Sequence, residues 1–322
     1  MKTDVICLGE LLIDFVSMAK DVSLIESPGF LKAPGGAPAN VAAGVVKLGG
    51  TAGFIGKVGD DPFGLYLKQV LNQLTVETSC LALDREARTT LSFVAQRPDG
   101  DRECMFYRHP GADMRLAAED IAEDYIAQGS VFHYGSISLG SPSSKAATLQ
   151  AIAYARKHGL LISYDPNLRT DLWPDPEHAR EEINAGFAHA DVVKISEEEY
   201  RFITGCTTVE DCGRYILERG PGLVIVTLGK DGCYYTNGRT SGFIAGFQAE
   251  VVETTGAGDA FVAAVLHTFA ERRRAGSTVQ DEELPAVLRF ANAAGALATT
   301  RIGAIPSLPT QDEVLALLDS AD

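Results

Sequence analysis

The segment Glu253–Asp259 contains residue types that can bind an anion and accept a proton. It reads ETTGAGD and leads directly into an apolar run that predicts a helix. Small residues at Gly256, Ala257 and Gly258 allow backbone N–H groups to converge on an anion, and the helix dipole adds positive potential there. Asp259, beside that anion, could take a proton from a substrate hydroxyl whose oxygen attacks phosphorus. The segment fits equally well a glycine-rich loop in which the aspartate only caps the helix.

A second segment, residues 34–40, reads PGGAPAN and precedes another predicted helix. Gly35 and Gly36 permit close approach of the backbone to a ligand. Asn40 offers both a donor and an acceptor, which suits vicinal hydroxyl groups. Alone, the segment also fits a tight loop before a helix, so it indicates a sugar site only in combination with the first segment.

The elements that position these segments can be predicted from the hydrophobic pattern. Short apolar runs alternate with longer helical patterns, which is typical of a parallel sheet covered by helices on both faces. Ligands of such sheets bind at the carboxyl ends of the strands. The predicted strands span Val5–Leu8, Ala52–Val58, Val131–Tyr134, Leu160–Tyr164, Val192–Ile195 and Leu223–Leu228. The predicted helices span Ala39–Leu48, Phe63–Leu74, Ser143–His158, Thr208–Arg219, Asp259–Arg274, Glu282–Thr300 and Gln311–Leu318.

Two segments, residues 11–33 and 88–108, interrupt this alternation. In the second, polar and apolar residues alternate over Thr90–Gln96, a turn is predicted at Pro98–Asp101, and Glu103–Tyr107 returns as a strand. This is a hairpin pattern. Since neither segment is long enough for a domain, we expect both to form one small sheet that projects as a lid from a single domain over residues 1–322.

Composition and charge exclude several classes of protein. The chain has 322 residues, 46% of them hydrophobic, and a net charge of −15, which argues against nucleic acid or an anionic membrane as partner. The N-terminus lacks the layout of a signal peptide, and no window of about 18 apolar residues predicts a membrane span. Six cysteines are scattered without metal-ligand spacing, which predicts reduced thiols in a cytoplasmic protein.

Together, the two chemical segments resemble the paired signature of the PfkB/ribokinase-like family of carbohydrate kinases. Residues 56–64 (GKVGDDPFG) and 227–232 (TLGKDG) are also similar to that family, and the resemblance extends from Cys7 to Pro306. It implies a three-layer α/β/α ribokinase-like fold with a mainly parallel central sheet and a small β-sheet lid. Within the family, residues 9–15 (GELLIDF), 107–114 (YRHPGADM), 165–169 (DPNLR) and 194–199 (KISEEE) are similar to fructokinases.

The resemblance also implies roles for individual residues. Asp259 would be the catalytic base, and Gly256, Ala257 and Gly258 would form an anion hole for the transferring phosphoryl group. Sugar-binding positions would be Asp14, Gly35, Gly36 and Asn40. Arg108 and Arg169 are candidates for sugar or phosphate contact, with a structural salt bridge as an equally good reading of each. ATP-binding positions would be Lys194, Thr227, Gly229, Gly232 and Asn292.

Two kinds of cation follow from the resemblance. Glu199 occupies the position of the family's Mg²⁺-organising glutamate, which acts through water because Mg²⁺ keeps much of its hydration. A monovalent cation, K⁺, would have ligands at Glu253 and Thr255, together with backbone or hydroxyl oxygens near Ala298, Arg301, Gly303 and Ser307. The family has aspartate where this chain has Glu253, and one extra methylene moves the carboxylate by about 1.5 Å. Activation by K⁺ is therefore an open question at the level of sequence.

The predicted reaction is phosphorylation of D-fructose by MgATP to fructose 6-phosphate. Other kinases of the same fold, acting on 2-keto-3-deoxygluconate, ribose or a nucleoside, remain alternatives. A different class is an inactive sugar sensor or scaffold, against which the intact Gly-Ala-Gly-Asp at 256–259 argues. Sugar and ATP are the expected partners, together with a second copy of the chain through the exposed edges of the lid.

Overall fold

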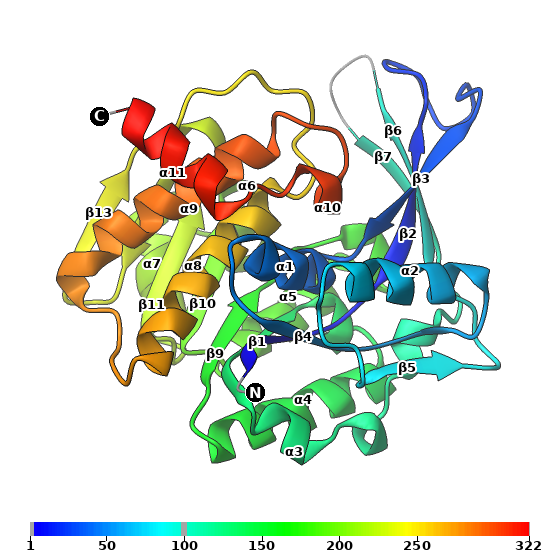
Figure 1. Ribbon diagram of the computed structural model, residues 1–322, viewed down its shortest axis with the longest axis horizontal. Coiled ribbons are helices and arrows are strands. Elements are labelled where there is room, and N and C mark those ends of the chain that lie inside the picture. Colours follow the sequence, from blue (N-terminus) through cyan, green and yellow to red (C-terminus); the bar gives the residue numbers. More distant parts are fainter. Residues whose placement is uncertain (1–2, 98–101, 322) are drawn as a thin grey trace.

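The computed structural model describes residues 3–97 and 102–321, and its centre is a nine-stranded sheet (Figure 1). The strand order is β13-β12-β11-β10-β9-β8-β1-β4-β5. Neighbours are parallel except at β11–β12 and β12–β13, which are antiparallel. The strands are β1 (Thr3–Leu8), β4 (Ala52–Gly59), β5 (Leu81–Asp84), β8 (Gly129–Gly135), β9 (Leu161–Asp165), β10 (Val192–Ser196), β11 (Leu223–Thr227), β12 (Cys233–Thr236) and β13 (Ser241–Ile244). The predicted mainly parallel sheet is confirmed.

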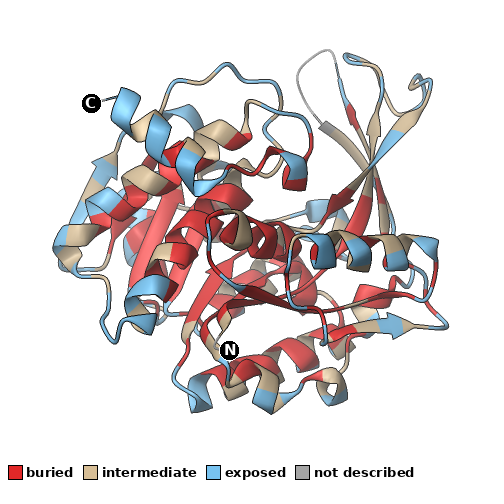
Figure 2. Cartoon of the chain, in the orientation of Figure 1, coloured by how far each residue is buried: buried red, intermediate tan, exposed pale blue. Residues whose placement is uncertain are grey.

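Helices cover both faces of this sheet, as predicted. Along β1, Val5 and Cys7 join one buried cluster while Ile6 and Leu8 join the other, because successive side chains of a strand point to opposite faces. The first cluster includes residues of α1 (Ala37–Lys47), α2 (Pro62–Gln73), α8 (Ala257–Arg274), α9 (Leu284–Ala298), α10 (Ala304–Ser307) and α11 (Gln311–Ser320). The second includes residues of α3 (Glu123–Ile126), α4 (Pro142–Lys157), α5 (Pro176–Phe187), α6 (Glu197–Thr204) and α7 (Val209–Leu217). Figure 2 shows the sheet buried between helices whose outer faces are exposed.

A separate four-stranded sheet, in the order β3-β2-β6-β7, projects from the main body (Figure 1). Its strands are β2 (Leu12–Ser17), β3 (Phe30–Gly35), β6 (Leu91–Gln96) and β7 (Arg102–Tyr107). The small sheet built from two distant segments is thus confirmed, although β3 continues two residues past the predicted boundary, as far as Gly35. The turn predicted at Pro98–Asp101 lies outside the described residues.

Some elements have no predicted counterpart. Helix α5 is largely polar, and it begins at Asp175, whose side chain accepts a hydrogen bond from the His178 N–H (2.8 Å). The Asp-Pro pair at its start was a usable signal, because aspartate caps helices and proline suits their first position. β12 and β13 have four residues each, too few for a hydrophobic pattern, and they form by pairing with β11 and with each other.

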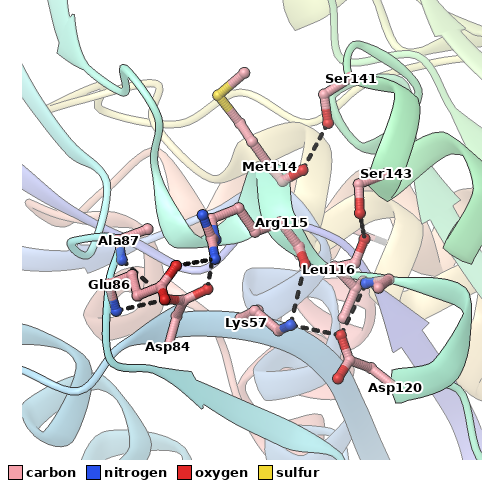
Figure 3. Close-up of polar contacts among 11 residues, drawn as sticks. Lys57, Asp84, Glu86, Ala87, Met114, Arg115, Leu116, Asp120, Ser141 and Ser143 are labelled. Atoms are coloured by element: carbon pink, nitrogen blue, oxygen red, sulfur yellow. Dashed lines mark hydrogen bonds and ion pairs between the residues drawn. The ribbon is translucent and has the colours of Figure 1, made fainter.

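The segment that begins GKVGDD at residue 56 contributes a structural anchor. Lys57 Nζ lies 2.6 Å from a carboxylate oxygen of Asp120 and donates to the carbonyl of Arg115 (3.0 Å), as Figure 3 shows. Arg115 in turn pairs with Asp84 at the end of β5 (2.9 Å). These contacts fix β4 and β5 to the stretch that follows the second lid segment.

Two expectations about the whole chain can be compared with the described residues. No helix among them is long and apolar enough to cross a membrane. Free thiols are present at Cys7, Cys80, Cys206, Cys212 and Cys233, as expected for reduced cysteines.

Candidate functional site

The carboxyl end of the large sheet is where the predicted site residues meet. β1 lies between β4 and β8, so the chain extends the sheet to one side of β1 first and later to the other. Such a reversal leaves a crevice at the carboxyl ends of the central strands. The small sheet follows β1 directly in the chain and stands at this same end.

Asp259 lies in this crevice and is held by two amide groups. Asn40 Nδ2 donates to one carboxylate oxygen at 2.7 Å, and Asn167 Nδ2 donates to the other at 3.3 Å. Burial raises the pKa of Asp259, and the Asn40 hydrogen bond and the charges of Lys194 and Arg169 oppose that rise. A carboxylate with a raised pKa is a better general base near neutral pH. The structure therefore joins the two chemical segments of the sequence.

The three small residues before Asp259 form the start of α8. The helix begins at Ala257, two residues earlier than predicted, with Gly256 as N-cap at φ 82°. The Ala257 N–H donates to the Thr254 carbonyl at 3.3 Å. A Cβ on Gly258 would lie 3.2 Å from Lys194 Nζ. The ammonium group therefore lies against the positive end of the helix dipole, and both features favour an anion at this point.

Lys194 lies in the middle of β10, among three carboxylates. Its Nζ lies 3.1 Å from Asp165, and both side chains are buried. Burial raises the pKa of Asp165 to about 7, although Lys194 lowers it. Burial works against the charge on Lys194, but Asp165 and Glu199 outweigh it and raise the pKa of the ammonium group. Lys194 therefore remains a permanent cation beside Gly258.

Glu199 is an ionised carboxylate in the same cluster. Its oxygens accept the backbone N–H groups of Ser196 (2.8 Å) and Leu168 (2.6 Å). Burial alone would raise the pKa of Glu199, but Lys194 and these hydrogen bonds lower it overall. Within residues 3–97 and 102–321, no group of three or more His, Cys, Asp or Glu side chains is arranged to hold a metal ion. The donor set fits Mg²⁺ carried by nucleotide phosphates and water, with Glu199 as its carboxylate.

The predicted sugar-binding residues line the entry to α1. Asp14 on β2 accepts a hydrogen bond from Ser92, and a Cβ on Gly35 would lie 2.1 Å from its other carboxylate oxygen. Gly36 has φ 109°, and a Cβ there would lie 2.3 Å from the Glu10 carbonyl oxygen. Asn40 Oδ1 is buried and has no hydrogen-bond partner among the described residues. Asp14 and Asn40 therefore present acceptors suited to polyol hydroxyl groups.

The two candidate arginines differ in their surroundings. Arg108 is 4% exposed and pairs with the equally buried Asp113 at 2.7 Å, so it forms the structural salt bridge that the sequence left as one of two readings. Asp113 also accepts a hydrogen bond from Thr90 (2.5 Å). Arg169 is exposed, donates to the Leu168 carbonyl (2.9 Å), and lies close enough to Asp259 to oppose the rise in its pKa.

The predicted nucleotide-binding residues lie further along the sheet. Thr227 ends β11, and Gly229 begins the 3-10 turn that follows, at φ 57°. Gly232 closes that turn at φ 99°, where a Cβ would lie 2.0 Å from the Ile244 carbonyl oxygen. Asn292 on α9 donates its amide to the carbonyls of Ile244 and Ala245, both at 3.1 Å. In this structure Asn292 therefore shapes the strand end beside the turn.

The residues implied for a K⁺ site are close together in the structure. Thr255 Oγ1 donates to one carboxylate oxygen of Glu253, and the Gly303 N–H donates to the other at 2.8 Å. Ser307 is fully buried and donates to the Ala304 carbonyl (2.9 Å). Of the remaining implied ligands, Ala298 ends α9 and Arg301 pairs with Glu313. Each oxygen of the Glu253 carboxylate therefore accepts one hydrogen bond, one from its own loop and one from the loop at residue 303.

The sequence analysis missed Asp165 and Asn167 as site residues. Asn167 has φ 44°, a region that asparagine tolerates better than most residues, and its N–H donates to Asp165 (3.3 Å). The usable signal was the position of DPN directly after a predicted strand, where parallel sheets place their ligands. Asp165 therefore links Lys194 to the loop whose amide reaches Asp259.

Glu10, directly beyond β1, was also missed. It is 3% exposed, its Oε1 accepts the Ala37 N–H (2.9 Å), and burial raises the pKa of its carboxyl to about 7.

The raised pKa of Glu10 makes the stability of the fold depend on pH, because the folded state holds this proton more tightly than the unfolded state. The contribution of Glu10 to stability is complete below the ordinary pKa of a glutamate and is lost as pH rises through about 7. At about 1.4 kcal/mol per pKa unit, the free energy of unfolding of wild type should fall by roughly 3 kcal/mol between pH 5 and 8. Glu10→Gln, which has no carboxyl at this position, should not show this loss. The melting temperature of the variant should therefore rise by several degrees relative to that of wild type as pH increases over this range. A difference in melting temperature that stays constant with pH would contradict the raised pKa of Glu10.

Known proteins that are similar to this chain over nearly its whole length are carbohydrate kinases. A model of the pfkB family of carbohydrate kinases matches residues 2–311. Fructokinase-1 of Zea mays is 49% identical over 319 residues, covering 98% of each chain. Fructokinase-2 of Solanum lycopersicum is 47% identical over 316 residues, covering 98% of this chain and 95% of its own.

Solved structures agree with these relatives. The fructokinase of Xylella fastidiosa with bound ATP has a TM-score of 0.90 at 33% identity and covers 100% of this chain and 99% of its own. The fructokinase of Vibrio cholerae O395 with fructose, ADP and calcium ion has a TM-score of 0.87 at 33% identity, covering 98% and 99%. A double mutant of the V. cholerae protein with fructose, ADP and potassium ion has a TM-score of 0.85 at 33% identity, covering 98% of each chain.

Proposed function

Because the chain belongs to the pfkB family of carbohydrate kinases, we propose that it is an ATP-dependent fructokinase that transfers the γ-phosphoryl group of ATP to O6 of D-fructose. The observation that carries this proposal is the 2.7 Å contact between Asn40 and Asp259, which joins a sugar-binding amide to a buried carboxylate at the start of α8. Relatives with fructose and ADP bound support the choice of substrates. Residues 1–322 then act as one kinase domain, with the small sheet as its lid.

The proton step belongs to Asp259. Fructose is held by Asp14 and Asn40, and its 6-hydroxyl donates its proton to the Asp259 carboxylate. The freed oxygen forms a bond to the γ-phosphorus while the bond between that phosphorus and the ADP oxygen breaks. The amides of Asn40 and Asn167 keep the carboxylate in place for this transfer.

The developing negative charge is met by the start of α8 and by Lys194. Backbone N–H groups at Gly256–Gly258 and the ammonium group beside them are fixed before the reaction, which is the arrangement that lowers barriers most effectively. When bound with ATP, Mg²⁺ would neutralise phosphate charge, and Glu199 would hold it through water. Thr227, Gly229 and Gly232 shape the turn that receives the nucleotide.

The small sheet would exclude water and pair two copies of the chain. Closing over the sugar, it limits wasteful hydrolysis of ATP. Its edge strands β3 and β7 expose Leu31 (55%), Met105 (44%) and Tyr107 (59%), side chains that a second small sheet would cover. Light scattering should accordingly give the mass of a homodimer. The free thiols of Cys7, Cys212 and Cys233 agree with a cytoplasmic enzyme.

The main alternative substrate is 2-keto-3-deoxygluconate, which carries a carboxylate. Arg108 does not favour it, because Asp113 already neutralises this arginine inside the protein. A coupled assay of ADP release should give a kcat/KM for fructose at least tenfold above that for 2-keto-3-deoxygluconate, ribose or a nucleoside. A higher kcat/KM for one of the other substrates than for fructose would show that the protein is a kinase of this fold but not a fructokinase. Sugar binding without ADP release from any of these substrates would indicate the inactive sensor.

Asn167 provides a test of how the base is tuned. Asn167→Asp replaces an amide donor 3.3 Å from Asp259 by a like charge, which should raise the pKa of the base. The acid limb of kcat/KM should then move to higher pH by about one unit. Asn167→Gly tolerates φ 44° and removes the amide without adding charge, so it should lower kcat and leave the limb near its wild-type position. Identical profiles for the two variants would contradict this role.

A further inference from the structure

Glu10 lies directly beyond β1 and binds the start of α1 from outside that helix. Its Oε1 accepts the N–H of Ala37, the first residue of α1, at 2.9 Å. The first N–H groups of a helix have no partner within the helix, and the side chain of the N-cap residue usually supplies one. The N-cap of α1 is Gly36, which has no side chain, so Glu10 supplies this acceptor from a different part of the chain.

The backbone around Glu10 also packs directly on the start of α1. A Cβ on Gly36 would lie 2.3 Å from the Glu10 carbonyl oxygen, and a Cβ on Gly9 would lie 2.5 Å from Cγ of Pro38. The two segments are therefore in contact through backbone as well as through the carboxyl group. Because they touch, the position of residues 36–38 depends on that of Glu10.

The first turn of α1 carries the amide that holds the proposed base. The Asn40 N–H donates to the Gly36 carbonyl at 2.9 Å, and Asn40 Nδ2 donates to Asp259 at 2.7 Å. Further along α1, a Cβ on Gly44 would lie only 2.6 Å from Cβ of Ala263 on α8, so close packing holds the rest of the helix. Loss of the contact with β1 should therefore displace the first turn and its amide, and leave the helix folded.

A buried carboxyl is a costly acceptor for one N–H group. The side chain of Glu10 is buried, and its second oxygen, Oε2, has no hydrogen-bond partner among the described residues. A buried polar atom without a partner opposes folding, and its presence calls for an explanation other than stability. The contact at Oε1 provides that explanation, because it fixes the turn that carries Asn40.

We infer that Glu10 is a positioning residue for phosphoryl transfer, which fixes the first turn of α1 so that Asn40 keeps the Asp259 carboxylate aligned with the sugar hydroxyl. In this role Glu10 acts through the Ala37 N–H and not by contact with fructose or ATP. The inference rests on the proposed fructokinase activity.

The test compares wild type with Glu10→Met and Glu10→Gln at pH 7. Glu10→Met has a similar size and no oxygen, whereas Glu10→Gln keeps an oxygen that can accept the Ala37 N–H. In Glu10→Met, kcat/KM for fructose should fall by about 10–100-fold, because a displacement of about 1 Å within a catalytic site reduces turnover this strongly. In Glu10→Gln it should stay within about threefold of wild type. KM for MgATP should change less than about twofold in both variants.

The pH profile and a double variant separate positioning from stability. Burial raises the pKa of Asp259, and the hydrogen bond from Asn40 opposes this rise. The acid limb of kcat/KM should therefore move to higher pH in Glu10→Met and stay in place in Glu10→Gln. Asn40→Ala removes the amide itself, so adding Glu10→Met to it should lower kcat less than about twofold further.

A helix cap remote in sequence provides the matched control. The Thr208 hydroxyl at the start of α7 accepts the Asp211 N–H at 3.1 Å. Thr208→Ala should lower the melting temperature and leave both kcat/KM and its acid limb unchanged.

NMR of the Asn40 side-chain amide provides a readout independent of turnover. Its ¹⁵N and ¹H signals should shift in Glu10→Met and stay in place in Glu10→Gln. If Glu10→Met does not fold, Glu10→Asp, whose carboxyl ends about 1.5 Å short of Ala37, takes its place with the same expected results.

Three outcomes would overturn the inference: kcat/KM of Glu10→Met within about twofold of wild type, an unchanged acid limb together with an unchanged Asn40 signal, or losses that multiply in the double variant. Absence of fructose-dependent ADP release by wild type would instead overturn the proposed function. The Asn40 signal would then still decide whether Glu10 positions this amide.

Discussion

Replacing Asp259 by asparagine should lower kcat by about 10²–10⁴-fold, because the variant loses the general base and keeps the shape of the site. The side-chain oxygen of the new amide could still accept the Asn40 amide, so the contact that joins the two segments is preserved. Fructose affinity measured by calorimetry should therefore change less than about threefold. Steady-state kinetics at saturating fructose and ATP give the turnover.

The matched control is Asp312→Asn, which makes the same chemical change at an exposed position at the start of α11. Its turnover should equal that of wild type. An Asp259→Asn enzyme that keeps more than about a tenth of wild-type turnover would show that another group takes the proton.

The second large effect is expected for Gly256→Ala, which should lower kcat by about 10²-fold. The residue has φ 82°, and its new Cβ would lie 3.0 Å from the Cα of Ala304, so backbone must move. Movement of the helix start withdraws N–H donors from the phosphoryl group, and loss of one such donor typically reduces turnover by about 10²–10³-fold.

A glycine beyond the other end of the same helix provides the control. Gly276 has φ 78°, and a Cβ there would meet no atom of the described part of the chain within 4 Å. Gly276→Ala should destabilise the fold by roughly 1–2 kcal/mol through its left-handed backbone and leave kcat unchanged. Equal losses of kcat in both variants would mean that general strain, and not the anion hole, explains the effect.

Local patterns were sufficient for most of the fold. The six predicted strands and the helices between them have hydrophobic patterns that arise within each segment, and the structure places them within a few residues of the predicted bounds. β12 and β13 depend on pairing with β11, which no local pattern records. The small sheet could be predicted because polar and apolar residues alternate along its hairpin. The extension of β3 to Gly35 could not be predicted, because it depends on the pairing of Gly35 with Leu12.

The residue types of the candidate site could be predicted from the sequence, but the contacts between them could not. Asn40 and Asp259 are 219 residues apart, so only family resemblance suggested that they act together. From the sequence, Arg108 could either contact sugar or phosphate or form a structural salt bridge. In the structure it forms a salt bridge with Asp113. Substitution of glutamate for the family's aspartate at position 253 was visible, but its use of the extra methylene to reach Gly303 depends on the folded loops.

The measurement that tests the central claim most directly is ³¹P and ¹³C NMR of wild type incubated with MgATP and fructose labelled with ¹³C at carbon 6. The proposed mechanism predicts ADP and one phosphate ester in equal amounts, with the labelled carbon showing coupling to phosphorus. ADP with inorganic phosphate and unchanged fructose, or a phosphate on any other carbon, would contradict it.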